Sequence, residues 1–226
     1  MPAHLFREIE NLKRDILTLG AMAETAVRDA TCAIENRDES LAENVIWNDV
    51  KLDEREVQIE ENCLKILALH QPVAIDLRFI IAVLKINNDL ERVGDLAVNV
   101  AERATFLAAQ PPVDISFDFQ AMARQAQEML KKSLDSLVNL SAGQAREVLA
   151  SDEAIDAMNR QMYRIVQEAI GAHPDQTGSL IHLLSVSRHL ERIADLATNI
   201  AEDVIYMIEG VIVRHKAEDY LHHRPG

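Results

Sequence analysis

A segment of thirteen residues occurs twice in this chain, one hundred positions apart. Residues 90–102 (LERVGDLAVNVAE) return as residues 190–202 (LERIADLATNIAE). Between the copies Val changes to Ile, Gly to Ala and Val to Thr, whereas every charged and amide residue is kept. A packed core constrains its apolar positions, so a repeat that keeps its polar residues best has a further role. The repeat predicts a duplicated fold in which these polar residues carry a function.

The composition favours helices. Aromatic residues make up 4% of the 226 residues, with only 7 Gly and 6 Pro, while 48% of the chain is hydrophobic. Such a chain can bury a core but is poor in strand formers. Apolar residues at helical spacing predict long helices over about 5–36, 39–69, 75–109, 117–140, 144–170 and 177–208. Gly20 interrupts the first pattern and predicts a weak point within that helix.

The clearest boundary is the pair Pro111 and Pro112, because proline cannot continue a helix. It divides the chain into a first unit of residues 1–110, a linker of 111–116 and a second unit of 117–226. Each unit holds three of the predicted helices. The predicted fold is therefore all-α, with two tandem antiparallel three-helix bundles related by pseudo-twofold symmetry.

Charge and segment composition limit the classes of function. With 37 acidic against 23 basic residues the net charge is −14, which disfavours nucleic-acid binding and suits a cation site. Cys32 and Cys63 form no zinc motif, so we expect buried free thiols in a reducing compartment. The N-terminus lacks the apolar core of a signal peptide, and no run of ~18 apolar residues spans a membrane. These features predict a cytoplasmic protein that reaches a membrane only through partners.

Each copy of the repeat carries an acidic pair on one helix face. Glu91 and Asp95 lie four residues apart, one turn from each other on the same side. Like charges at this spacing cost a few tenths of a kcal/mol, so a duplicated pair points to a compensating cation. Asn99 continues the same face. The second copy supplies Glu191, Asp195 and Asn199.

The preceding predicted helix supplies a facing acidic pair, Asp49 and Asp53. In an antiparallel hairpin, residues equidistant from the turn lie level with each other. Asp53 with Glu91 and Asp49 with Asp95 share the midpoint residue 72, a proline already assigned to the turn. Helix axes lie about 8–10 Å apart, so four carboxylates can reach one ion or a small cluster.

The second unit follows the same rule. Its facing pair is Asp152 and Asp156, and the pairings Asp156 with Glu191 and Asp152 with Asp195 share a midpoint at the predicted turn 171–174. A solvated acidic surface is the alternative for any single pair. Level pairs present in both units favour two metal sites instead.

The ligand type limits the metal. Carboxylate and amide oxygens suit Mg²⁺, Mn²⁺, Ca²⁺ or iron. Zinc is less favoured, because no Cys or His falls on the acidic stripe. His189 replaces Asp89 of the first copy and is a weak candidate ligand, while Trp47 is interpreted as a packing or interface residue.

Three segments together resemble the PhoU family of phosphate-signalling proteins. They are the duplicated LER-[IV]-x-D-x-A-x-N-[IV]-A-E pattern, residues 71–78 (QPVAIDLR) and residues 213–216 (VRHK). The resemblance implies two three-helix bundles with metal clusters at Glu91/Asp95 and Glu191/Asp195. Arg78 has no counterpart in the second unit, so we expect its contact to be one-sided.

The resemblance also implies a function. Members of this family act as negative regulators of the phosphate-starvation (Pho) regulon and of phosphate uptake. They are adaptors between the ATPase of a phosphate ABC transporter and a phosphate-sensing histidine kinase. This implies a cytoplasmic protein, peripheral at the inner membrane face through its partners, that binds no nucleic acid and is not an enzyme. A homodimer is the expected assembly.

Two enzymatic alternatives use the same acids. A metal-dependent phosphatase would use the clustered metal centre, but no Ser, Cys or His nucleophile accompanies the motif. A ferritin-like di-iron oxidase would need Glu-x-x-His pairs, and the chain contains none.

Overall fold

The computed structural model describes residues 3–113 and 115–211. Within them the chain forms six long helices and one short 3₁₀ turn, with no strand. The elements are α1 (Ala3–Asn36), α2 (Glu39–His70), α3 (Ala74–Ala108), α4 (Phe119–Val138), α5 (Ala142–Ala172), η1 (Pro174–Gln176) and α6 (Thr177–Glu209).

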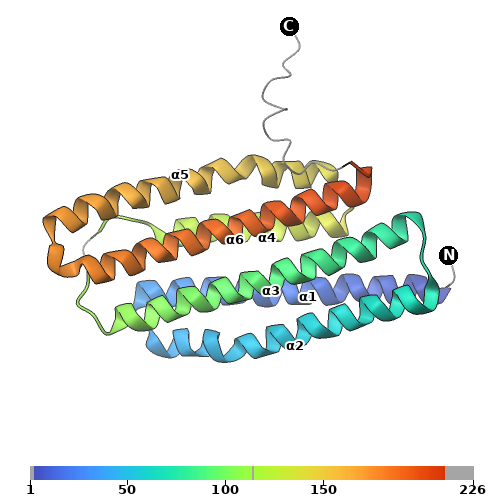
Figure 1. Cartoon of the computed structure of the whole chain (residues 1–226), viewed down its shortest axis with the longest axis horizontal. Helices are drawn as coiled ribbons and strands as arrows, with labels where there is room; N and C mark the ends of the chain where they lie inside the picture. The colour runs from blue at the N-terminus through green and yellow to red at the C-terminus, as the bar shows by residue number, and fades with distance from the viewer. Residues whose placement is uncertain (1–2, 114, 212–226) are drawn as a thin grey trace, which may run out of the picture.

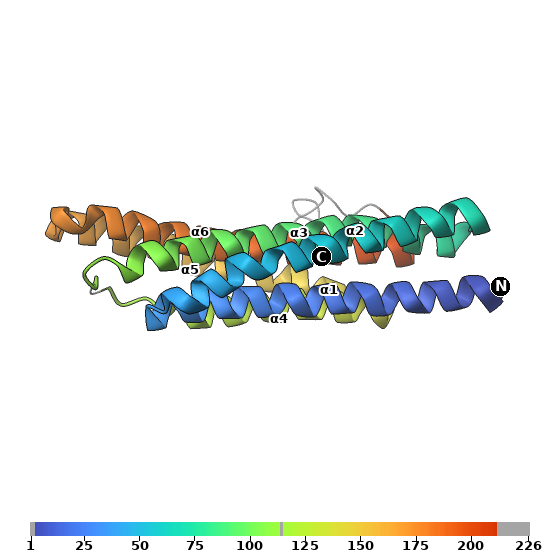
Figure 2. The same ribbon diagram turned by 90° about the horizontal axis from the view of Figure 1, so that it is seen from below.

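The two halves of the chain form an elongated bundle of near-parallel and antiparallel helices. Figure 1 shows α1, α2 and α3 on one side and α4, α5 and α6 on the other, with α3 and α6 running in opposite directions along the boundary. Turned by 90°, α1 and α4 lie in one layer below α3 and α6 (Figure 2). The halves pack together through α3 with α6 and α1 with α4, while α2 and α5 cover the outer flanks. The predicted all-α fold of two tandem three-helix bundles is confirmed.

The two copies of the repeat have equivalent surroundings. Each residue of 90–101 is as buried, half-buried or exposed as the residue one hundred positions later. Leu90, Ala97 and Ala101 are fully buried, as are their counterparts. The repeat therefore occupies the same place in both halves, which is what pseudo-twofold symmetry requires.

Local chemistry sets the helix ends near the predicted places. The side chain of Asp38 accepts a hydrogen bond from the backbone N–H of Leu41 at 2.9 Å and caps α2. Gln71 ends α2 in the left-handed region, with φ of 44°, before Pro72. This turn joins α2 to α3 and fixes which of their residues lie level.

The first helix is continuous through Gly20, as the apolar pattern predicted. Gly20 is buried and faces Leu134 of α4. That it is a weak point within the helix stays a prediction. The division of the chain at residues 111–116 stays a prediction, since the two halves share extensive contacts. In the described part of the chain, no helix is both long and apolar enough to cross a membrane.

Candidate metal centres

The first acidic cluster lies between α2 and α3. Asp49 and Asp53 of α2 lie close enough to Glu91 and Asp95 of α3 for their charges to interact. Burial, followed by repulsion from Asp53 and Asp95, raises the pKa of Asp49 to about 6. Burial and the same set of carboxylates also raise the pKa of Glu91. The cluster thus holds more negative charge than its surroundings stabilise.

The second cluster repeats this arrangement between α5 and α6. Burial, with repulsion from Asp156 and Asp195, raises the pKa of Asp152 to about 6. The pKa of Glu191 and of Asp195 is raised as well, again mainly through burial and then through neighbouring carboxylates. The eight acids singled out from the sequence therefore lie in two clusters of four, one in each half of the chain.

The Asp49 carboxylate lies where α2 approaches α3 closely. A Cβ placed on Gly94 would lie 3.1 Å from Oδ1 of Asp49 and 2.9 Å from Cδ1 of Leu52. The second copy has Ala194 at this position, fully buried. Small residues on this face of the motif helix let the facing helix carry its acids into contact range.

One further acid and one amide belong to the first cluster, although sequence reasoning did not select them as site residues. Glu56 adds to the repulsion on Glu91. The buried Asn87 donates from Nδ2 to the Glu56 backbone oxygen at 2.9 Å and to Oε1 at 2.8 Å. This cross-helix bond fixes the register of α2 against α3. The signal was a polar residue in the apolar stripe, four positions before the Glu of the motif.

The second half has a matching polar contact. Ser187 stands one hundred positions after Asn87, and its Oγ donates to Oδ1 of Asn159 at 2.8 Å. Register is thus held by a buried polar pair in each half, with different chemistry. Hydrogen bonds of this kind contribute about 1 kcal/mol each and exclude slipped pairings.

The side chains of both clusters are of the type that binds a hard cation, but they are not preorganised around an ion. Carboxylate oxygens are the ligands that Mg²⁺, Mn²⁺, Ca²⁺ and iron accept, and the raised pKa values show a demand for positive charge. Among the described residues, however, no three His, Cys, Asp or Glu side chains are arranged to hold an ion. The predicted metal role of these residues therefore stays a prediction.

Asn99 and Asn199 lie beside the clusters. Nδ2 of Asn99 donates to the backbone oxygen of Asp95 at 2.7 Å. Both amides line a cavity of about 290 Å³ between α3 and α6, made by equivalent residues of the two copies. Its lining is Arg92, Asp95, Leu96, Asn99, Arg192, Asp195, Leu196 and Asn199.

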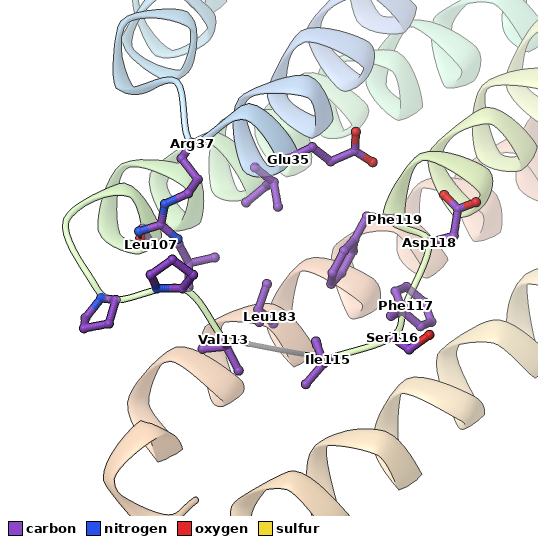
Figure 3. A pocket seen from close by; sticks show the side chains of 13 residues that line it. Glu35, Arg37, Leu107, Val113, Ile115, Ser116, Phe117, Asp118, Phe119 and Leu183 are labelled. Atoms are coloured by element: carbon purple, nitrogen blue, oxygen red, sulfur yellow. The ribbon is translucent and has the colours of Figure 1, made fainter.

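A separate cavity of about 660 Å³ lies beneath the connection from α3 to α4 (Figure 3). Arg37, from the turn between α1 and α2, points to the end of α3. Its Nη2 donates to the backbone oxygens of Leu107 at 2.5 Å, Ala108 at 3.1 Å and also Gln110. A cation here satisfies carbonyls that the helix end leaves unpaired. Arg78 caps the end of α6, the second helix that carries the repeat, in the same way. Its Nε donates to the backbone oxygen of Met207 at 3.1 Å.

The remaining polar candidates have structural settings. Cys63 is buried, and burial raises the pKa of its thiol to about 12, so it is unreactive. Cys32 is half-buried and also unpaired. Trp47 does not pack in the core, because 78% of it is exposed. His189 lies in the seam between α3 and α6, where burial and then Arg103, Arg192 and Arg188 lower its pKa to about 4.

The fold and the paired clusters define a class: a duplicated helical-bundle protein with two equivalent carboxylate-lined sites. Comparison with known proteins identifies the family. The PhoU domain family model matches residues 16–104 and 119–204, so the chain belongs to the PhoU family. Both matched ranges contain one copy of the repeat.

Relatives resemble the chain over almost its whole length. A protein of Aquifex aeolicus, described as a phosphate-specific transport system accessory protein PhoU homolog, is 38% identical over 94% of this chain and 96% of its own. The crystal structure of PhoU from Pseudomonas aeruginosa has a TM-score of 0.85 at 33% identity, covering 91% of this chain and 99% of that one. The phosphate transport system regulatory protein PhoU from Streptococcus pneumoniae has a TM-score of 0.83 at 28% identity, covering 92% and 99%.

Proposed function

We propose that this protein is a regulatory adaptor of phosphate transport. It restrains phosphate uptake and the phosphate-starvation response by docking on the ATPase of a phosphate ABC transporter and on a phosphate-sensing histidine kinase. Relatives described as transport-system accessory proteins support this role. The protein works at the cytoplasmic face of the membrane, which it reaches through these partners.

The observation that carries the proposal is an apolar face on the outside of α2. We call Trp47, Val50, Val57 and Leu64 the α2 apolar face. Their exposed fractions are 78%, 56%, 49% and 54%. A large exposed apolar surface marks a binding site for another molecule, and Trp is enriched among the anchor residues of protein interfaces.

The second half of the chain provides an internal comparison. Buried positions of α2 recur on α5 after 103 residues, so that Leu52 matches Ile155 and Ile59 matches Met162. The exposed positions do not recur. Where α2 has its apolar face, α5 carries Ala150, Glu153, Arg160 and Gln167. A fold requirement would apply to both copies, so the apolar residues of α2 serve something outside the fold.

The pattern of the face limits its partner. Val50, Val57 and Leu64 recur every seven residues, the spacing at which two helices pack side by side. Glu54 and Glu61 alternate with them on the same side of α2. An acidic, apolar helix face fits a partner helix with apolar and basic residues and disfavours an anionic membrane surface.

The metal clusters have a supporting role in this proposal. Bound cations (iron, Mn, Mg, Ca or Zn) neutralise the facing carboxylates and hold α2 against α3, and α5 against α6. The α2 apolar face is thereby presented on a stiff helix. The repeated motif, residues 90–102 and 190–202, contains no Ser, Cys or His nucleophile, which favours a binding role over catalysis. A homodimer is the proposed assembly.

The test transfers residues of α5 onto α2. Val57→Arg and Leu64→Gln install the counterparts of Arg160 and Gln167, which the fold already accepts. In phosphate-replete cells we expect the double variant to release a phosphate-starvation reporter and to stop co-purifying with the ATPase and the kinase.

The matched control is Arg160→Ala with Gln167→Ala on α5, which should leave reporter and partners unchanged. Circular dichroism checks that both proteins are folded. An α2 variant that keeps repression and both partners would refute docking through this face. A deletion that leaves the phosphate response intact would refute the regulatory role itself.

The second candidate function is a metal-dependent phosphatase, favoured by the clustered carboxylates. Two-metal sites of hydrolases use bridging carboxylates of this kind. Turnover of phosphate esters with Mn²⁺, Mg²⁺ or iron that disappears in Asp95→Ala would support it. No turnover with any of these metals would remove it.

A further inference from the structure

The seam between α3 and α6 is closed at one end by an ion pair. Lys85 of α3 pairs with Asp203 of α6, and the side chain of Asp203 is 3% exposed. The pair joins the two halves of the chain, since its members lie 118 positions apart. Opposite charges at this end of the seam compensate each other.

Pseudo-twofold symmetry relates this pair to a different one at the other end. One hundred positions from Lys85 stands Ser185, and one hundred positions from Asp203 stands Arg103. A lysine is thus replaced by a serine and an aspartate by an arginine. The nearby Asp89 is likewise replaced by His189. At these positions the second end of the seam has no carboxylate and carries a guanidinium instead.

Side chains at the second end have unused hydrogen-bonding capacity. Oγ of Ser185 lies 3.3 Å from Nε2 of His189, and Nδ1 of His189 is buried without a hydrogen-bond partner. Nδ1 of His182 is buried in the same way, while its ring stacks on Phe106 of α3 at 3.8 Å. In residues 3–113 and 115–211, no carboxylate forms an ion pair with Arg103.

More positive charge gathers around the same point. Arg103, Arg192 and Arg188 all lie close enough to act on His189. Two of these arginines have carboxylates close by, because Arg188 acts to lower the pKa of Glu191 and Arg192 that of Asp195. The guanidinium at this end that still needs a counter-ion is therefore that of Arg103. Arg192 lines the cavity of about 290 Å³ between α3 and α6 together with Asp95 and Asp195, so that cavity does not suit an anion and the candidate groups are those around Arg103.

We propose that Arg103, Ser185 and His189 bind a small tetrahedral oxyanion at this end of the seam. Guanidinium groups match the geometry of such oxygens through paired N–H donors, and the Ser185 hydroxyl supplies a further donor. The anion takes the place of the carboxylate that Asp203 supplies at the other end. It therefore joins α3 to α6, so the contact between the two halves depends on a ligand at one end only.

Inorganic phosphate is the probe, a choice that rests on the proposed function. Chelator-treated protein is titrated by calorimetry at constant ionic strength, so that no metal ion carries the anion. Sulfate and chloride are titrated in parallel. Saturable binding of phosphate, or of phosphate and sulfate alike, supports the oxyanion site, and binding of chloride alone refutes it.

The test variant copies the closed end of the seam. Arg103→Asp with Ser185→Lys places the Lys–Asp pair at the second end, in the arrangement that the first end already accepts. We expect phosphate affinity to fall at least tenfold with the melting temperature maintained. The matched control, Arg160→Gln, removes one exposed arginine and the same net charge elsewhere, and should bind as wild type.

Two results would overturn the proposal: no saturable oxyanion binding at millimolar concentration, or a double variant that binds as tightly as wild type. If the double variant fails to fold, Arg103→Gln alone replaces it with the same expectation. Partner co-purification is measured on the same proteins. Failure of anion binding with partners retained leaves the adaptor role intact, so the two proposals fail separately.

Discussion

Gly20 of α1 lies so close to Leu134 of α4 that a methyl group on Gly20 would overlap Cδ1 of that leucine. The glycine marks a close approach of α1 to the other half of the chain. A glycine inside a helix costs about 1 kcal/mol relative to alanine. That cost is accepted here because two helices meet at this position.

Replacing Gly20 by Ala is expected to destabilise the protein. The gain in helix propensity is about 1 kcal/mol, while overpacking a close contact costs about 1–3 kcal/mol, so the expected net loss is up to about 2 kcal/mol. Urea unfolding followed by circular dichroism measures it. Gly171 of α5 is the control, because a Cβ there meets no atom within 4 Å. Gly171→Ala should cause no loss, and an equal loss in both variants would contradict the packing explanation.

The stability of the metal-free protein is expected to depend on Asp49 and Asp152. The pKa of each is about 6 in the folded state, above the ordinary value of 3.8. Between these values the folded protein binds more protons than the unfolded chain, so stability falls as pH rises from about 4 to about 6 and then levels off. Melting temperatures in the presence of chelator follow this fall.

The matching variants are Asp49→Asn and Asp152→Asn, which cannot ionise at these positions. Each should flatten part of the fall between pH 4 and pH 6. An unchanged pH profile in the combined variant would show that these carboxylates are not strained in the folded protein. Added divalent cation should raise the melting temperature of wild type above pH 6 and have less effect on the variant.

Metal content tests the clusters directly. A variant with Glu91→Gln, Asp95→Asn, Glu191→Gln and Asp195→Asn should lose the bound metal that purified wild type carries, because each cluster loses two of its carboxylates. Elemental analysis of both proteins measures this. Glu54→Gln with Glu61→Gln, on the outer face of α2, is the control for general loss of negative charge. Equal metal content in wild type and the quadruple variant would place the metal elsewhere.

Removing Arg37 should loosen the end of α3. Arg37→Ala leaves the carbonyls of Leu107, Ala108 and Gln110 without their shared donor. Loss of a charged hydrogen-bond donor of this kind costs about 1–3 kcal/mol. Hydrogen exchange should accelerate at the amides of Ala109 and Gln110, and Arg37→Lys, which keeps the charge, should fall between the two. Unchanged exchange in Arg37→Ala would show that the carbonyls need no cap.

The helices and the grouping of the acids were predictable because they follow from periodicity. Helical spacing of apolar residues located all six helices, and Pro72 with antiparallel geometry placed Asp49 level with Asp95. The apolar periodicity is local in the sequence, and the pairing of Asp49 with Asp95 follows from the position of one turn. The structure brings the acids together on that basis, while metal binding stays a prediction.

Contacts between distant segments were not predictable in this way. Arg37 reaches α3 over seventy positions, and no period connects them. The contact of Gly20 with Leu134 was not predictable either, because a sequence does not show which helix lies against a glycine. Arg103 and His189 lie just outside the repeat and differ from their counterparts Asp203 and Asp89. Only the antiparallel packing of α3 against α6 shows that these two residues come close to each other.

The faces through which the two halves of the molecule meet, α3 on α6 and α1 on α4, do not require a continuous chain. The two halves meet as the two subunits of a symmetric dimer meet, so the chain has the form of a fused dimer. Fusion changes what mutation can do. In a dimer of identical subunits, a change at one position appears at both symmetric positions at once. In the fused chain, Trp47 can face outward from one half while Ala150 does so from the other, and each half can specialise separately.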